Sequence, residues 1–181
     1  MQVTAALPQT GTWTIDPTHT TIGAVARHLI ASKVRGSFKA FSGTIEVAEQ
    51  LEDSKVTVTI DPSSIDTGVA DRDAHLRSAD FLNADEFPEM VFASTAVRKA
   101  GEGYEIDGDL TMAGVTNPIT LELDYLGVTT DPWGNQKAMF AAAGKLEREQ
   151  WGLTWNAALE SGGLLVSKTF DLEIEAQAAL S

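Results

Sequence analysis

Five residues capable of acid–base or ion-pair chemistry lie close together in the segment DRDAHLR: Asp71, Arg72, Asp73, His75 and Arg77. Asp73 beside His75 would supply the carboxylate and base of a hydrolase. Such a pair still needs a nucleophile, and the sequence has no cysteine and no Gly-x-Ser-x-Gly motif that singles out a serine. On a helix of two turns the same spacing gives surface pairs, Asp71 with His75 and Asp73 with Arg77. We therefore expect a short helix, braced by polar pairs, that acts as a lid or plug.

Composition argues against several classes of function. The 181 residues include 13 Lys and Arg against 26 Asp and Glu, a formal net charge of −13. Such a surface repels phosphate backbones and anionic membranes, so we expect no nucleic-acid partner and no stable membrane insertion. With no cysteine, three histidines and no His-Glu-x-x-His spacing, we expect no metal and no cofactor. The N-terminal residues lack the basic start and apolar core of a signal peptide, which predicts a cytoplasmic location.

Apolar and polar residues alternate along most of the chain, as half-buried antiparallel strands require. The clearest strand patterns cover residues 55–61, 104–112, 119–125 and 170–176. Weaker strand patterns cover residues 13–15, 20–29, 34–47, 90–98 and 137–147. Segments rich in Gly, Pro, Asn and Asp separate them, as hairpin connections need. We therefore expect strands that are neighbours in sequence to pair antiparallel.

These patterns predict an all-β fold of about eight strands with one or two short helices, either a barrel or a sandwich. A barrel is favoured because several residues on inward-facing positions are small and would leave room for a ligand: Ala24, Ala26, Gly108, Ala138, Ala142 and Gly144. The alternative is that these positions lie at bulges or face a covering helix. We expect an N-terminal tail over residues 1–11 and one domain over residues 12–178.

Five segments in order resemble the YceI-like family of lipocalin-like, polyisoprenoid-binding proteins. The first segment matches through Trp13, Ile15, Asp16, His19, His28, Val34, Gly36 and Phe38. The second, and most specific, matches through Arg72, Asp73, His75, Leu76, Asp80, Phe81, Pro88 and Phe92. The others match through Gly114, Val115, Thr116 and Pro118, through Arg148, Trp151 and Gly152, and through the closing strand VSKTFDLEIEAQ. The resemblance spans residues 13–177.

The resemblance implies an antiparallel eight-stranded lipocalin-like barrel whose apolar tunnel holds an isoprenoid lipid, such as a polyprenyl phosphate or an isoprenoid quinone. The protein would be a carrier and not an enzyme. Inward position together with the family fold predicts the tunnel lining: Ile22, Ala24, Ala26, Phe38, Val58, Ile60, Phe92, Leu110, Met112, Leu121, Leu123, Phe140 and Phe170. Ala24 stands where the family often has Phe, which implies a wider tunnel or a different ligand.

A polar head group would need donors, and five are available at or near the family motifs: His28, Arg72, His75, Arg77 and Arg148. Each has an alternative role. His28 would be a core histidine, and Arg72 and Arg148 would neutralise buried carboxylates such as Asp73 and Glu147.

Two other functions remain open at this level. One is a stress-related structural or interaction protein whose barrel is filled by its own side chains, with Trp13, Trp133, Trp151 and Trp155 as the filling. The other is a hydrolase that uses Asp73 and His75. A homodimer through an exposed edge strand is also left open.

Overall fold

A computed structural model describes residues 7–181, which form eleven strands, one α-helix and three short 3-10 helices. The first strands and helices are β1 (Gly11–Ile15), β2 (Thr21–His28), β3 (Ser32–Phe38), β4 (Phe41–Val47), η1 (Leu51–Asp53), β5 (Lys55–Ile60), η2 (Pro62–Ser64), β6 (Ile65–Asp66) and α1 (Ala70–Arg77). The remainder are β7 (Met90–Ala100), β8 (Gly103–Met112), β9 (Val115–Thr130), β10 (Gln136–Glu147), η3 (Arg148–Trp151) and β11 (Thr169–Leu180).

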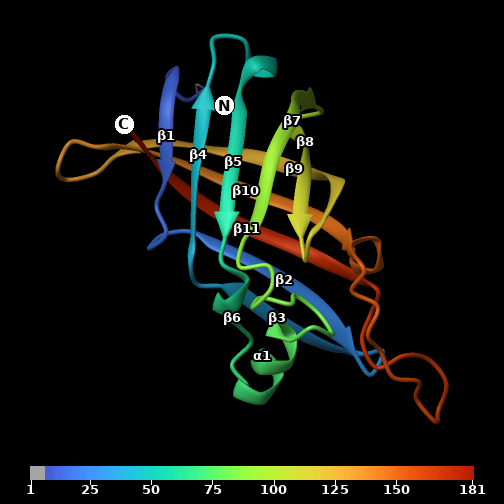
Figure 1. The fold of residues 1–181 in the computed structure, drawn as a ribbon. Coiled ribbons are helices and arrows are strands. Elements are labelled where there is room, and N and C mark those ends of the chain that lie inside the picture. Colours follow the sequence, from blue (N-terminus) through green and yellow to red (C-terminus); the bar gives the residue numbers. More distant parts are fainter. Residues whose placement is uncertain (1–6) are drawn as a thin grey trace.

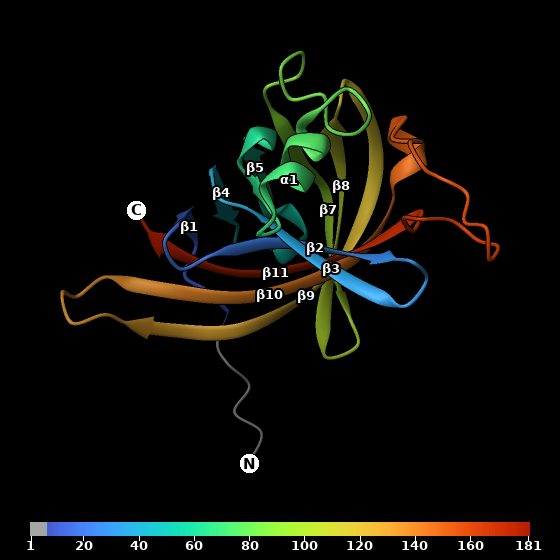
Figure 2. The same cartoon turned by 90° about the horizontal axis from the view of Figure 1, so that it is seen from below.

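Eight of the strands close an antiparallel barrel in the order β1-β4-β5-β7-β8-β9-β10-β11, and β1 pairs with β11 to complete it. The fold class predicted from the alternating pattern is therefore confirmed. Most of the strand pairings in the barrel join strands that are consecutive in sequence, as the turn residues between them predict. Figures 1 and 2 show this barrel from two directions.

β11 has a different neighbour at each end. Its residues 171–175 pair with β2, and its residues 178–180 pair with β1. From β2 the sheet continues through β3 to β6, outside the closed ring. The helix α1 follows β6 and lies beside β3 and β6 at the lower end of the barrel in Figure 1. These extra elements form the wall and cover of that end.

The single strand predicted over residues 34–47 is wrong. The structure ends β3 at Phe38 and begins β4 at Phe41, and the two strands pair with different neighbours. Lys39 and Ala40 form the break, where the Lys39 amide donates to Ser64 O and Ala40 O accepts from the Asp61 amide. The apolar alternation shifts by one position between Phe38 and Phe41, as two separate strands require.

The buried side chains form two clusters. The larger one lies at the α1 end and includes Phe81, Leu82, Met90, Phe92 and Leu110. The smaller one is called here the Trp13 cluster. It consists of Trp13, Ala138, Phe140 and Ala178 together with the partly buried Ile45, Val47, Leu123, Tyr125, Ala176 and Leu180. The two clusters thus occupy the two ends of the barrel interior, and Leu123 packs against both.

Candidate functional site

An apolar cavity of about 480 Å³ lies inside the α1 end of the barrel. Its wall is almost entirely hydrophobic, and it draws on β2, β3, β5, β7–β11, α1 and the loop of residues 152–168. Arg27 and Asp71 line the cavity and are exposed, so the cavity reaches the molecular surface. This volume lies in the range of small-molecule sites in proteins.

The predicted lining residues mostly lie at this cavity. Ile22, Ala24, Ala26, Phe38, Val58, Ile60, Phe92, Leu110, Met112, Leu121 and Phe170 all contribute to its wall. Leu123 and Phe140 do not, because Phe140 belongs to the Trp13 cluster at the other end of the barrel and Leu123 packs between that cluster and the larger one. Inward orientation was correct for these two residues, but it does not say which end of the interior a side chain occupies.

Only part of the space predicted from small residues is empty. Ala24 and Ala26 face the cavity. A Cβ on Gly108 would overlap the Phe92 ring, and one on Gly144 would lie 2.8 Å from Leu121 Cδ2. Ala138 is fully buried within the Trp13 cluster. Small residues on β8 and β10 therefore accommodate large neighbours instead of a ligand.

The charged segment forms the two-turn helix expected, with a different set of polar contacts. Asp73 is buried, and its Oδ1 accepts hydrogen bonds from the Thr67 amide (2.9 Å) and the Thr67 hydroxyl (2.6 Å). Arg72 donates through Nε to Thr67 Oγ1 and through Nη2 to Thr67 O. The expected pairs of Asp71 with His75 and of Asp73 with Arg77 are not formed. The helix is instead tied to Thr67, in the connection from β6.

His75 belongs to the cavity wall and pairs with Asp80, not with Asp73. Its Nε2 lies 2.9 Å from Asp80 Oδ2. Its ring makes edge contacts with Phe81 and Trp155, at centroid distances of 5.1 and 4.5 Å. The catalytic dyad of Asp73 and His75 that the sequence left open is therefore not assembled.

Three of the five candidate head-group donors, His28, Arg72 and His75, line the cavity, whereas Arg77 and Arg148 do not. Arg148 is 0% exposed and lies behind the wall, with its Cζ 5.7 Å from the centre of the Phe81 ring. It donates to Ser167 O and Leu153 O, and burial lowers the pKa of its guanidinium. The alternative of an ion pair between Arg148 and Glu147 is also wrong, since no such pair forms.

The loop of residues 152–168 supplies wall residues that the sequence patterns did not reveal. Leu153, Trp155, Leu165 and Val166 line the cavity from a segment without regular strands. Its apolar run Leu164–Val166 was the available signal. Alternation cannot be read from so short a run, so its buried side was not predictable.

Comparison with known proteins gives a family for this architecture. A model of the YceI-like domain matches residues 13–178. The chain belongs to the YceI-like family. A protein named YceI from Salmonella newport (strain SL254) is 44% identical over 137 residues, which cover 75% of this chain and 72% of that protein.

Solved structures of similar proteins support the YceI-like fold. The Campylobacter jejuni YceI protein is 30% identical with a TM-score of 0.72, over 86% of this chain and 90% of that one. Burkholderia cenocepacia BcnA is 19% identical with a TM-score of 0.76, over 90% and 98% of the two chains. A polyisoprenoid binding domain from Saccharophagus degradans is 14% identical with a TM-score of 0.71, over 96% and 100%. At these identities the last two show likeness of fold alone.

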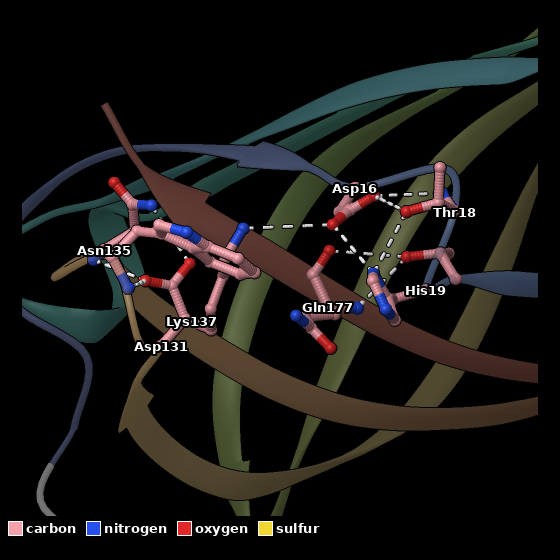
Figure 3. Close-up of polar contacts among 9 residues, drawn as sticks. Asp16, Thr18, His19, Asp131, Asn135, Lys137 and Gln177 are labelled. Atoms are coloured by element: carbon pink, nitrogen blue, oxygen red, sulfur yellow. Dashed lines mark hydrogen bonds and ion pairs between the residues drawn. The ribbon is translucent and has the colours of Figure 1, made fainter.

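Asp16 and His19, from the first family segment of this YceI-like chain, belong to a polar cluster (Figure 3) whose residues do not line the cavity. Asp16 Oδ1 accepts from the Thr18 amide and hydroxyl, and Oδ2 lies 3.0 Å from His19 Nδ1 and 3.8 Å from Lys137 Nζ. Chiefly the Thr18 hydroxyl, with His19 adding to it, lowers the pKa of Asp16 to about 2. The Asp16 amide also donates to Gln177 O. The cluster therefore fixes the β1–β2 connection where β11 changes neighbours.

Within residues 7–181, no three His, Asp or Glu side chains are grouped closely enough to hold a metal ion. None of the described helices combines the length and the apolar character needed to cross a membrane.

Proposed function

We propose that this protein binds an isoprenoid lipid in the apolar cavity and carries it without chemical change. The observation that carries the proposal is the cavity of about 480 Å³ with a nearly continuous hydrophobic wall that reaches the surface beside α1. A prenyl chain loses unfavourable contact with water when it enters such a space, at about 25 cal/mol for each Å² buried. Affinity would come from apolar area more than from directional contacts.

The polar groups of the wall fit a ligand with one polar end. Arg27, His28, Thr67, Arg72 and His75 line the cavity amid the hydrophobic residues. These donors suit a polyprenyl phosphate or an isoprenoid quinone. Membership in the YceI-like family supports an isoprenoid ligand, and the name of the Saccharophagus domain agrees with it.

The two alternatives have less support. A hydrolase would need a nucleophile near a base. Among residues 7–181, the only hydroxyl side chain in the cavity wall is that of Thr67, which donates to Asp73 and accepts from Arg72. The second alternative, a barrel filled by its own side chains, fits only the end that holds the Trp13 cluster. Trp133, one of the expected fillers, is 84% exposed at the β9–β10 turn.

Location and assembly remain predictions from the sequence. A cytoplasmic carrier would serve lipids at the inner face of a membrane. For a homodimer, β9 offers the candidate edge, because β8 pairs with β9 only over residues 115–123 while β9 continues to Thr130.

The proposal is tested by extracting the purified protein with organic solvent and analysing the extract by mass spectrometry. Delipidated protein is then titrated with a polyprenyl phosphate and with an isoprenoid quinone in detergent. A stoichiometric isoprenoid, or saturable binding of either probe, supports the carrier. No isoprenoid in the extract together with no binding in the titration contradicts it.

A further inference from the structure

Three exposed apolar side chains lie together where the β2–β3 hairpin meets the loop of residues 152–168. Leu29 is 50% exposed, Ile30 is 64% exposed, and Leu164 is exposed as well. The Leu29 amide donates to Leu165 O (3.0 Å), and Ile30 packs beside Gly163. We call Leu29, Ile30 and Leu164 the apolar tip. It lies near the lower right of Figure 1, where the blue hairpin meets the orange-red loop.

The apolar tip adjoins the cavity. His28 and Val166 form a β-bridge next to it, and both residues line the cavity. Leu165, whose carbonyl accepts from Leu29, lines the cavity too. The apolar tip therefore lies against this part of the cavity wall.

The backbone of the tip is a conformation that its side chains disfavour. Leu29 and Ile30 have φ angles of 53° and 72°, in the left-handed region. A β-branched residue such as Ile30 rarely adopts this region, which Asn or Gly would occupy at lower cost. The hairpin therefore keeps two large apolar groups in water at a position where polar residues would fold more easily.

The charge around the tip is opposite to that of the whole protein. Residues 25–35 include Arg27, Lys33 and Arg35 and no acid, in a chain with a net charge of −13. Arg27 and Lys33 are direct cross-strand partners, an arrangement of like charges that destabilises a hairpin. Within residues 7–181 neither of them forms an ion pair, whereas Arg35 pairs with Glu173. The neighbouring loop adds one acid, Glu160.

We propose that the apolar tip docks the protein on a bilayer that contains anionic phospholipid, so that the part of the cavity lined by Arg27, His28, Leu165 and Val166 faces the membrane. Leu29, Ile30 and Leu164 enter the interfacial region while Arg27 and Lys33 meet lipid phosphates. The acidic body is repelled by the same surface, which orients the molecule tip-first. This inference rests on the proposed function, for which it supplies the route of the lipid into and out of the cavity.

The test is co-flotation with phosphatidylcholine vesicles, with and without phosphatidylglycerol and free of isoprenoids. The wild-type protein should bind the vesicles with phosphatidylglycerol more tightly. Leu29→Asn/Ile30→Asn should bind them at least about tenfold more weakly, because the apolar insertion is lost. Asn suits the left-handed backbone, so the melting temperature of this variant should not fall. Lys33→Glu should reduce only the preference for vesicles that contain phosphatidylglycerol over vesicles of phosphatidylcholine.

Leu126→Asn is the matched control, since Leu126 is 60% exposed on β9, away from the hairpin. It should bind vesicles like the wild type. The proposal is overturned if the wild type binds neither kind of vesicle, if the tip variant binds normally, or if Trp133→Asn abolishes binding instead. Loading of a polyprenyl phosphate in detergent is measured on the same variants. Normal loading without docking refutes docking by the apolar tip and leaves the proposed carrier function intact. Docking without loading refutes the carrier function.

Discussion

Six inward side chains of β11 divide between the two ends of the barrel. Phe170, Leu172 and Ile174 line the cavity, whereas Ala176, Ala178 and Leu180 surround Trp13. The end with the larger side chains on this strand is hollow, and the end with the smaller ones is filled. Side-chain size on one strand therefore does not decide where space remains.

The difference lies in the strand that pairs with β11 at each end. At the filled end, β1 supplies Trp13, which is fully buried and donates through Nε1 to Gln9 O. At the hollow end, β2 supplies Ala24 and Ala26, with Ala24 opposite Leu172. No side chain of tryptophan size enters the interior from β2. The two alanines on β2 thus contribute to the space at the hollow end.

The largest expected effect is at the filled end. Trp13→Ala should lower the free energy of unfolding by about 3–5 kcal/mol, because it leaves a large cavity among residues that cannot collapse onto it. Affinity for a polyprenyl phosphate should not change, since Trp13 lies outside the ligand cavity. Urea denaturation followed by circular dichroism measures the first, and titration under folded conditions the second. A loss below about 1 kcal/mol would mean that this end is not held by Trp13.

A smaller effect is expected where the small residues of the hollow end accommodate large neighbours. Gly108→Ala should cost about 1–3 kcal/mol of stability, because the new Cβ overlaps the Phe92 ring. Phe92 would be displaced into the cavity, so ligand affinity should fall as well. If Gly108→Ala binds the probe more tightly, the position is empty space and not a site filled by Phe92.

The next effect concerns the Asp16 cluster and its pH dependence. The pKa of Asp16 is about 2 in the folded protein against an ordinary 3.8, so its stabilisation is complete above the ordinary value. It should be lost as the pH falls from about 4 to 2, by about 1–2 kcal/mol after allowance for solvent screening. Urea denaturation of wild type and Asp16→Asn at several pH values isolates the contribution of Asp16 to the free energy of unfolding. A constant difference between the two proteins across that range contradicts the assignment.

The sequence predicted the barrel, its strand pairing and the short helix because alternation and turn residues are local properties. It also predicted most of the cavity wall, since inward parity on β2, β5, β8 and β11 follows from the same alternation. The shift of parity between Phe38 and Phe41 was equally readable and would have separated β3 from β4.

The division of the interior was not predictable in this way. Leu123 and Phe140 have the same parity as true wall residues, and only the register of β9, β10 and β11 places Phe140 beside Trp13 and Leu123 between the two clusters. The partners of Asp73 and Arg148 are backbone and hydroxyl groups, which no pattern of charges marks. Contacts through a loop, such as those of Trp155, depend on the tertiary fold.

The most direct test of the account is the binding of a fluorescent polyprenyl alcohol by Ala24→Trp, with Ala143→Trp on an exposed position of β10 as the control. The indole at position 24 would fill the hollow end as Trp13 fills the other. We expect at least about tenfold weaker binding in Ala24→Trp, a change in unfolding free energy below about 1 kcal/mol, and normal binding in the control. Unchanged binding by a stably folded Ala24→Trp would contradict the assignment of the cavity as the lipid site.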